Sequence, residues 1–448
     1  MSEQQNIDRR DFLRVAAIAS AAGLAGCAAS GGHADSRPMT SGTMAGFAAP
    51  TLGTIRVGVV GIGARGPTHV NNLTKMPGVE IKAICDNVQG HAEHGAAIVT
   101  NAGKPAPELY TRGDHDYERM NDRDDLDLIV NAAPWGWHVP MSLDAMKKGK
   151  HAFTEVPFAG TIDDCWAIVE MSEKTRKHCV MMENCCYGEM ELMCLRLARE
   201  GMFGELIHGE GAYLHHIADE KLGAGQPKAK WRLEPSIKYD GNTYPTHGLG
   251  PVAQYMGVNR GDRFDYMVSL SSPSMGLHLR AVELFGAEDV RSKTKYKQGD
   301  VNTSIIKTAR GRTIMVQHDT SNPRPYSRIN TIQGTKGIFC GYPDRIAFGE
   351  EWGDLAAISK KYMHPLWAKH EAKAIGGGHG GMDYVMMARL LDCLHQGLPL
   401  DMDVYDAAAV CAVTELSRNS IAKRGGSVDF PDFTRGQWKV TPELGVVS

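Results

Sequence analysis

An apolar run that leads directly into a glycine-rich turn dominates the first part of this sequence. Residues 54–66 read TIRVGVVGIGARG, so β-branched residues precede three closely spaced glycines. This is the order of a buried strand, a tight turn and a helix, the G-x-G-x-x-G pattern of a dinucleotide site. Its glycines let the backbone approach a pyrophosphate at the helix N-terminus. We therefore expect a dinucleotide to be bound by Gly61, Gly63, Ala64, Arg65 and Gly66.

A second apolar run supports this interpretation. Residues 79–86 read VEIKAICD, and the run ends in Asp86, twenty residues after Gly66. A carboxylate at the end of the second strand accepts hydrogen bonds from ribose hydroxyls and repels a 2′-phosphate. The sequence therefore predicts NAD rather than NADP.

The composition of the chain excludes several classes of protein and kinds of site. The chain has 448 residues, enough for two or three domains, with 42% hydrophobic and 23% charged residues, as in soluble globular proteins. A net charge of −3 without a basic stripe gives no indication of nucleic-acid binding. The ten cysteines include no C-x-x-C pair, which argues against a zinc ribbon or a thioredoxin-like site.

The amino terminus has the pattern of an export signal. Arg9 and Arg10 precede a short apolar run, which is typical of the twin-arginine (Tat) route. Residues 24–27 read LAGC and resemble a lipobox, so Cys27 is either lipidated or close to an ordinary cleavage site. We expect a signal over 1–27, a flexible linker over 28–53, and a protein exported to the periplasm or cell envelope. Such a protein must keep and regenerate its NAD or use a recycling partner.

The next strands complete an amino-terminal Rossmann domain, predicted over residues 54–184. A strand over 126–133 ends at Pro134-Trp135-Gly136-Trp137-His138, and ligands bind at the carboxyl edge of a parallel sheet. We therefore expect Trp135 and His138 to contact the cofactor, while Trp137 could equally cap the sheet. Strands over 151–154 and 179–182 end at Glu155-Val156-Pro157 and Glu183-Asn184.

The second half, residues 185–448, is predicted to be a substrate-binding α/β domain. A helix over 189–200, a strand over 206–216 and a hairpin over 303–320 indicate a mostly antiparallel open sheet beside helices. We expect the open face of this sheet to cover the nicotinamide end of the Rossmann domain.

Several polar groups in this half suit proton transfer or sugar binding. Tyr244 and His247 place a phenol and an imidazole on one short turn. Trp231 offers an aromatic ring for stacking, and the guanidinium of Arg232 can bind hydroxyl or acyl oxygens. Tyr326 lies on the loop after the hairpin. His379 lies among glycines and could serve the site or cap a helix. His215 and His216 lack a third ligand at a suitable spacing, so we predict no metal site.

These motifs resemble the glucose–fructose oxidoreductase / inositol dehydrogenase / MocA (Gfo/Idh/MocA) family. Most of its members have Glu-Lys-Pro after the fourth strand, and that lysine takes part in proton transfer with a downstream histidine. Here the element is Glu155-Val156-Pro157. Valine carries no proton, which argues against an ordinary dehydrogenase mechanism.

Seven motifs in order, from RG after the glycine turn to the PRPY turn, resemble glycoside hydrolase family 109, the NAD-dependent α-N-acetylgalactosaminidases. The resemblance implies an NAD site formed by Gly61, Gly63, Ala64, Arg65, Gly66, Asp86, Trp135, Gly136, Trp137, His138, Glu155, Val156, Asn184 and Tyr244. It implies a sugar pocket formed by Tyr213, Arg232, Tyr244, Pro245, Thr246, His247 and Tyr326. We assign proton transfer to His247, with Tyr244 or Tyr326 sharing it.

The predicted reaction is hydrolysis of terminal α-N-acetylgalactosamine without net redox change. The sugar is oxidised at C3, loses its C2 proton and its C1 leaving group, adds water, and is reduced again. Two alternatives stay open: a net sugar oxidoreductase, and a sugar-binding lipoprotein that retains the dinucleotide without turnover. We also expect a glycoconjugate or oligosaccharide substrate and a homo-oligomer.

Overall fold

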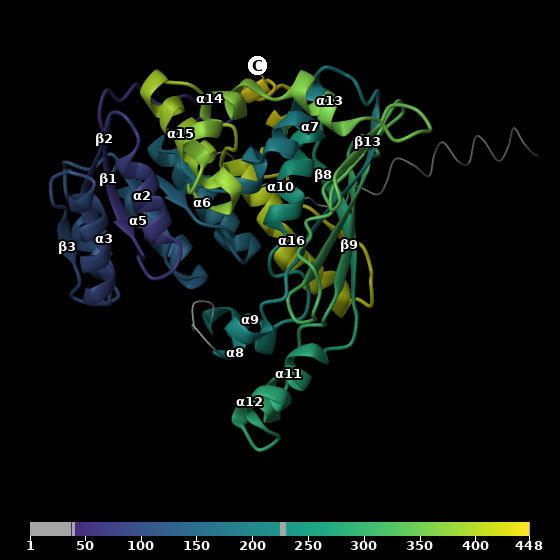
Figure 1. The fold of residues 1–448 in the computed structure, drawn as a ribbon, viewed down its shortest axis with the longest axis horizontal. Coiled ribbons are helices and arrows are strands. Elements are labelled where there is room, and N and C mark those ends of the chain that lie inside the picture. The colour runs from purple at the N-terminus through teal and green to yellow at the C-terminus, as the bar shows by residue number, and fades with distance from the viewer. Residues whose placement is uncertain (1–36, 38–40, 225–229, 448) are drawn as a thin grey trace, which may run out of the picture.

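The computed structural model describes residue 37, residues 41–224 and residues 230–447, which form two domains side by side (Figure 1). The predicted export signal and Cys27 lie outside the described residues. No helix in the described part of the chain combines the length and apolar character needed to cross a membrane.

The first domain is built on a parallel six-stranded sheet in the order β3-β2-β1-β4-β5-β6. This is the strand order of a dinucleotide-binding Rossmann fold. β1 is apolar nearly throughout and buried, as expected for a strand covered on both faces. The strands are β1 (Ile55–Val60), β2 (Val79–Cys85), β3 (Glu108–Tyr110), β4 (Leu128–Asn131), β5 (His151–Thr154) and β6 (Cys179–Met181).

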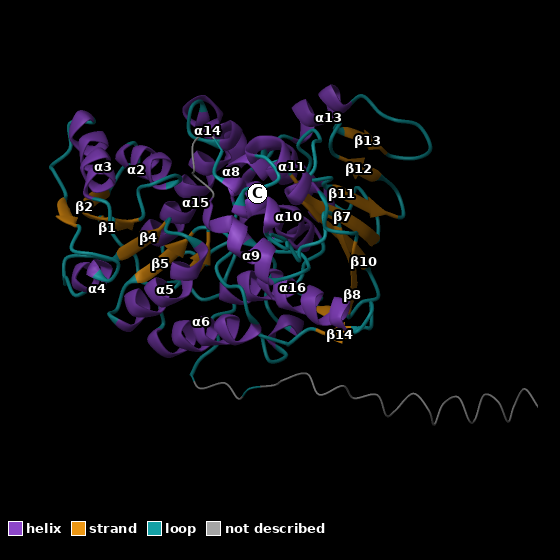
Figure 2. Ribbon diagram, turned by 90° about the horizontal axis from the view of Figure 1, so that it is seen from below, coloured by secondary structure: helices purple, strands orange, loops and turns teal. Residues whose placement is uncertain are grey.

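Helices alternate with these strands and cover the sheet (Figure 2). They are α2 (Gly66–Thr74), α3 (Gln89–Asn101), α4 (Asp116–Asn121), α5 (His138–Lys147) and α6 (Ile162–Thr175).

The second domain contains an eight-stranded sheet in the order β13-β12-β11-β7-β10-β9-β8-β14. Only the β7–β10 pair is parallel, so the predicted fold class, a parallel Rossmann sheet followed by a mostly antiparallel one, is confirmed. The strands are β7 (Leu206–Leu214), β8 (Phe264–Ser271), β9 (Asn302–Thr308), β10 (Thr313–Asp319), β11 (Thr331–Gly334), β12 (Ile338–Cys340), β13 (Arg345–Ala347) and β14 (Val428–Asp429).

Helices α10 and α16 pack against this sheet on the side of the Rossmann domain, and α8, α9, α11 and α12 form a projection below it (Figure 1). On the opposite face of the sheet, Tyr266 and Ile305 remain 40% and 39% exposed, so the sheet is open on the side away from the Rossmann domain. The prediction that the open face covers the nicotinamide end of the Rossmann domain is therefore wrong, because α10 and α16 lie between the sheet and that domain. The helices are α7 (Glu189–Arg199), α8 (Ala218–Leu222), α9 (Leu233–Lys238), α10 (Thr246–Tyr255), α11 (Gly276–Phe285), α12 (Val290–Lys293), α13 (Leu355–Tyr362), α14 (Pro365–Ala374), α15 (Met382–Gln396) and α16 (Val404–Ala422).

Two glycines allow α10 to approach β7 at backbone distance. A Cβ atom at Gly211 would overlap the carbonyl of Gly248, and one at Gly248 would overlap the backbone of Ala212. Interiors this tightly packed tolerate little added volume. The contact brings Tyr213 of β7 beside His247 of α10, with their ring centroids 5.5 Å apart.

The structure corrects two local predictions. Residues 244–247 were expected to form a short turn, but Thr246 and His247 are the first residues of α10, which packing stabilises despite its internal Gly248, Gly250 and Pro251. A flexible linker was expected over residues 28–53, yet within its described part, residues 41–53, Met44 is buried and its N–H donates to the Tyr405 hydroxyl. This segment is therefore part of the fold.

Candidate active site

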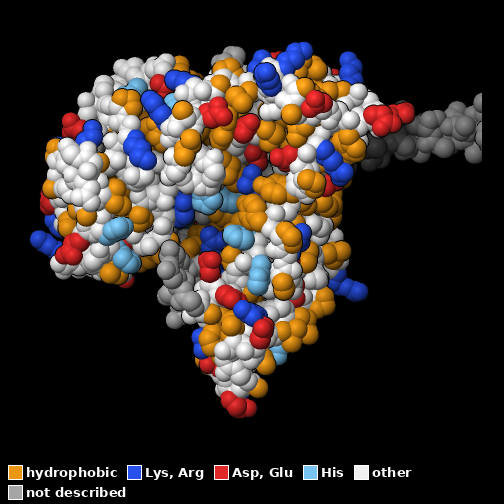
Figure 3. All heavy atoms as spheres, in the orientation of Figure 1, with side chains coloured by type: hydrophobic (Ala, Val, Ile, Leu, Met, Phe, Trp, Pro, Cys, Tyr) orange, Lys and Arg blue, Asp and Glu red, His pale blue; other side chains and the backbone are white. Residues whose placement is uncertain are grey.

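A cavity of about 600 Å³ opens where the carboxyl edge of the Rossmann sheet faces the second domain. Histidine side chains and side chains of the Lys and Arg class surround the hollow between the two domains (Figure 3), and the cationic side chains of the lining are Arg65 and Arg232. One wall is the glycine turn after β1, and the opposite wall includes Tyr213, Arg232, Tyr244 and His247. The cavity thus joins the predicted cofactor and sugar residues.

The glycine turn is shaped for close approach of a ligand. Gly61 has φ of 82°, and a Cβ atom there would lie 2.6 Å from the backbone nitrogen of Ala133. A Cβ atom at Gly66 would overlap the Gly61 carbonyl, so this glycine lets α2 start directly behind the turn. Gly63, Ala64 and Arg65 line the cavity. These features fit a dinucleotide pyrophosphate at the start of α2.

Asp86 lies at the same edge of the sheet, on the cavity wall. Its carboxylate accepts hydrogen bonds from the backbone N–H groups of Ile62 (2.7 Å) and Val88 (2.8 Å). This fixes a negative charge beside the turn, where it suits ribose hydroxyls and disfavours a 2′-phosphate.

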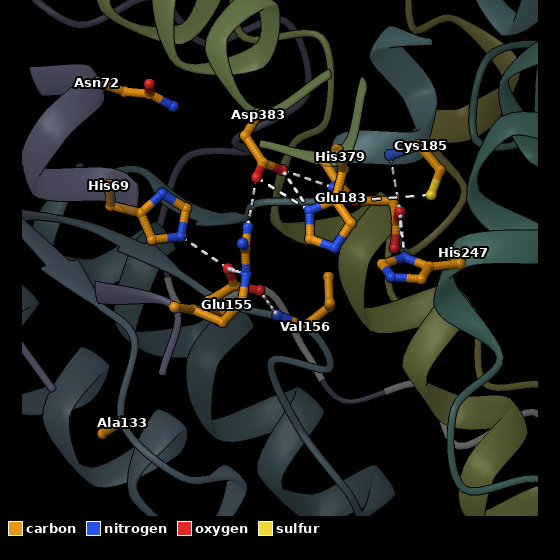
Figure 4. A network of polar contacts seen from close by, with 12 residues as sticks. His69, Asn72, Ala133, Glu155, Val156, Glu183, Cys185, His247, His379 and Asp383 are labelled. Atoms are coloured by element: carbon orange, nitrogen blue, oxygen red, sulfur yellow. Dashed lines mark hydrogen bonds and ion pairs between the residues drawn. The ribbon is translucent and has the colours of Figure 1, made fainter. Parts of the chain in front are cut away.

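Arg65 ties the glycine turn to the second domain. Its guanidinium donates to Glu155 (3.0 Å) and to Asp383 at the start of α15 (2.7 Å). Asp383 also accepts from Asn184 at 2.6 Å and lies 3.0 Å from His379 Nδ1. Figure 4 shows Asp383 and His379 facing each other on one side and the Glu155–His69 pair on the other.

The charges of this network stabilise one another. Burial favours neutral Asp383, but the hydrogen bond from His379 and the charge of Arg65 outweigh it and lower its pKa to about 2. Burial likewise opposes the charge of Glu155, and His69 and Arg65 hold its pKa well below the usual value. Both carboxylates are therefore ionised at neutral pH, and they hold Arg65 in place.

A carboxylate–imidazole–phenol series forms the opposite wall. Glu183 Oε1 lies 2.7 Å from His247 Nδ1, and His247 Nε2 lies 3.4 Å from the Tyr244 hydroxyl. The Glu183 side chain is fully buried, so its charge acts on the imidazole with little screening by water. A proton on Nδ1 then donates to Glu183 and leaves the Nε2 lone pair facing the cavity, as a general base requires.

Arg232 supplies positive charge beside the two tyrosines. Its guanidinium carbon lies 5.0–5.2 Å from the ring centroids of Trp231, Tyr244 and Trp135. Burial opposes its charge, but Tyr213 and Tyr244 more than offset this and raise its pKa. Burial also raises the pKa of Tyr244 well above its usual value, so the phenol is protonated at neutral pH.

The cavity brings together most of the residues predicted from the sequence. Those that line it are Gly61, Gly63, Ala64, Arg65, Asp86, Trp135, His138, Glu155, Val156, Asn184, Tyr213, Arg232, Tyr244 and His247. Gly66 supports the turn from behind, whereas Gly136, Trp137, Pro245 and Thr246 do not line this cavity. Tyr326 also lies outside its lining, beside His215, with ring centroids 5.0 Å apart.

The sequence prediction missed the charged partners of these residues. The sequence analysis places Glu183 only at the end of a strand and does not single out Asp383, although each bonds a site residue far away in the sequence. Glu183, Cys185 and His247 also place three possible ligand atoms within 4.8 Å of one another. However, the 2.7 Å separation of Glu183 and His247 is that of a hydrogen bond, shorter than about 3.4 Å between two ligands of one zinc ion.

Comparison with known proteins agrees with this geometry. The family described as "Glycosyl hydrolase 109, C-terminal domain" matches residues 187–440, and "Oxidoreductase family, NAD-binding Rossmann fold" matches residues 55–183. A glycosyl hydrolase family 109 protein from Shewanella sp. (strain W3-18-1) is 48% identical over 99% of both chains. The chain belongs to glycosyl hydrolase family 109. A second family 109 protein, from Shewanella putrefaciens, is 47% identical over 99% of both chains.

Solved structures at lower identity share the fold of this family 109 member. Levoglucosan dehydrogenase in complex with NADH and levoglucosan is 20% identical, with a TM-score of 0.63 over 84% of this chain and 100% of that chain. An NAD-binding oxidoreductase from Klebsiella pneumoniae is 14% identical, with a TM-score of 0.65 over 84% of this chain and 99% of that chain. The protein is thus a glycosidase built on an NAD-binding oxidoreductase fold.

Proposed function

We propose that this protein hydrolyses terminal α-N-acetylgalactosamine residues with a retained NAD that ends each cycle in its starting state. The proposal depends on one observation: the glycine turn and Asp86, which fit a dinucleotide, lie in the same cavity as the Glu183–His247–Tyr244 series on the opposite wall. A glycosidase that uses an ordinary pair of catalytic carboxylates does not need a dinucleotide-binding site.

The cofactor would be held by the glycine turn, Asp86, Trp135, His138 and Glu155. When bound, NAD supplies reversible hydride transfer at C3 of the sugar. The protein's own task is then to move protons. His247 Nε2 and the Tyr244 hydroxyl form the pair that takes the C3 hydroxyl proton and, once C3 is a ketone, the acidified C2 proton.

Loss of the C2 proton forms a C1–C2 double bond and expels the C1 leaving group. Water then adds across this double bond, with its hydroxyl going to C1 and a proton from solvent to C2, before C3 is reduced again. Arg232 is placed to stabilise negative charge that develops on the sugar oxygens, because its guanidinium lies beside both Tyr213 and Tyr244. Val156 occupies the position where many Gfo/Idh/MocA proteins have a lysine, so the proton-transfer pair has no third member from that strand end.

Retention of the cofactor is supported by the contacts of Arg65. Asp383 at the start of α15 pairs with Arg65 of the glycine turn and accepts from Asn184, so a dinucleotide bound at the turn would lie beside contacts that join the two domains and slow its release. Retention also suits the export that we propose from the twin-arginine motif, since a folded protein could carry its NAD across the membrane. Replacing Arg9 and Arg10 by lysine should then leave the protein in the cytoplasm, whereas unchanged export would contradict this route.

One experiment tests the proposed reaction. The purified protein is assayed on an aryl α-N-acetylgalactosaminide without added cofactor, and its bound nucleotide is measured. We expect NAD to co-purify with the protein, and we expect the phenol of the aryl glycoside to be released while no NADH accumulates. Accumulation of NADH would favour the sugar oxidoreductase, and binding without turnover would favour a sugar-binding protein.

A further inference from the structure

A second cavity, of about 370 Å³, adjoins the active site. Its lining includes Arg328, Asn330, Tyr342, Asp344 and Trp367. His379 lines both cavities, so a ligand that extends past this side chain would pass from one into the other. Nothing in the proposed reaction uses the second cavity, since the cofactor and one sugar ring account for the first.

The lining of the second cavity has the chemistry of a sugar-binding site. Tyr342 is 38% exposed and offers a ring face of the kind that packs against the C–H face of a hexose. Asn330 is buried, and its Oδ1 accepts from the Tyr255 hydroxyl at 3.0 Å, while its amide nitrogen has no partner within the described residues. An unpartnered amide in a cavity wall is a donor for a ligand hydroxyl.

Arg328 fixes the shape of this wall. Its guanidinium pairs with buried Glu191 at 2.5 Å and donates to the Tyr326 hydroxyl at 3.4 Å. The same guanidinium lies 5.8 Å from the ring centroid of Tyr326 and 5.4 Å from that of Tyr342. Both rings are thereby held by one buried ion pair, and neither depends on a ligand for its position.

A series of aromatic rings joins a lining residue of the first cavity to a lining residue of the second. The ring centroids of Tyr244 and Tyr213 lie 4.5 Å apart, those of Tyr213 and Tyr326 lie 6.3 Å apart, and those of Tyr326 and Tyr342 lie 6.0 Å apart. The series begins at the proton-transfer pair and ends in the second cavity. Tyr326 lines neither cavity, so a saccharide of two rings would extend from one cavity to the other past His379, which lines both, rather than along these rings.

The charges of the second cavity select against anionic sugars. Glu189 and Asp344 both line it, and neither forms an ion pair within the described part of the chain. The positive charge of Arg328 is already offset by Glu191. A sugar carboxylate would therefore meet two uncompensated negative charges, whereas a neutral hexose would find acceptors for its hydroxyls.

We propose that the second cavity is the subsite for the leaving-group saccharide, and that it takes a neutral hexose attached to C1 of the cleaved sugar. This rests on the proposed function, because only a glycosidase reaction gives the second ring a reason to be there. No covalent step occurs in this cavity. Its role is to hold the second ring while the bond at C1 is broken.

The test compares a substrate with a second ring and one without. N-acetyl-α-galactosaminyl fluoride carries only a fluoride as leaving group, whereas an α-N-acetylgalactosaminyl-galactoside also fills the proposed subsite. In Tyr342→Ala we expect kcat/KM to fall by about tenfold or more for the disaccharide and to stay within about twofold for the fluoride. Equal losses on both substrates, or none on either, would overturn the subsite.

A matched control is Tyr239→Ala. Tyr239 is 43% exposed and stacks with Arg418, but it lines a different cavity. It should leave the ratio of the two kcat/KM values unchanged. A selective loss on the disaccharide in this variant would also count against the subsite, since a distant aromatic residue would then have the same effect.

Binding without turnover separates this proposal from the proposed function. Saturation-transfer NMR with methyl β-galactoside should show contact with the wild-type protein, weaker contact with Tyr342→Ala, and none for methyl glucuronide with either. If the wild-type protein releases no sugar from either substrate but binds the galactoside in this way, the proposed function fails and the hexose site stands. If neither protein binds the galactoside, or if the glucuronide binds better, the hexose site fails.

Discussion

The substitution Glu183→Gln tests whether the Glu183 carboxylate keeps His247 in the form that can accept a proton. The Glu183 carboxylate is fully buried and lies 2.7 Å from His247 Nδ1, so it fixes the imidazole proton on that nitrogen and stabilises the imidazolium. Glutamine has nearly the same shape, but its neutral amide can donate to Nδ1 and force the proton onto Nε2, where His247 could no longer act as a base.

The size of the effect follows from the bond that is lost. A hydrogen bond to a charged group contributes about 1.5–3 kcal/mol. This corresponds to a loss of roughly 10- to 150-fold in kcat. We expect KM and the bound NAD to change little, because Glu183 does not line the cavity. The assay is steady-state hydrolysis of the galactosaminyl fluoride, with nucleotide content measured in parallel.

Glu173→Gln is the matched control for this prediction. Glu173 is also fully buried and bonded, to Tyr405 and Arg435, but it belongs to α6, away from the cavity. It should lower the melting temperature and leave kcat unchanged. If Glu183→Gln kept the wild-type kcat, or if both variants lost activity only in proportion to their loss of folded protein, the role assigned to Glu183 would be refuted.

Three further predictions follow from the contacts described above. Gly211→Ala should cost about 1–3 kcal/mol in unfolding free energy and lower kcat, because its methyl group would overlap the carbonyl of Gly248. Asp383→Asn should raise the rate of NAD release, measured by dilution into a dinucleotide trap, because Arg65 loses its partner on α15. Burial lowers the pKa of Lys221 to about 7, so the folded state releases this proton well before the unfolded state does. The unfolding free energy should therefore rise between pH 7 and 10, and Lys221→Met should abolish that rise.

Each of these three predictions has either a control variant or a result that would contradict it. Gly136→Ala meets no atom within 4 Å of the added carbon and should be silent, whereas an equally silent Gly211→Ala would contradict the close β7–α10 contact. Asp392→Asn, on the same helix but at the surface, should not change NAD release. A pH dependence of stability that persists in Lys221→Met would show that another group causes it.

The Rossmann half could be predicted from local sequence because its signals are local. The strand before Gly61, the turn itself and the strand ending at Asp86 each lie within one short segment, and apolar runs bounded by glycine define them. The position of Asp86 on the cavity wall follows from the order of a parallel sheet, in which strand ends meet at one edge.

The second half was harder to predict because long-range packing overrides local preference. Gly248, Gly250 and Pro251 read as helix breakers, yet α10 forms because two glycines let it pack on β7. Helix α16 was not predicted, since it is buried on most sides and lacks a clear polar face. Glu183 and His247 are 64 residues apart, and no spacing rule connects them.

The most direct test of the account is hydrolysis in D₂O followed by analysis of the released N-acetylgalactosamine. Removal of the C2 proton by the His247–Tyr244 pair predicts one deuterium at C2, with NAD recovered in its oxidised form. Released sugar that keeps its original hydrogen at C2 would show that the bond at C1 is cleaved without elimination, and would contradict the proposed role of the cofactor.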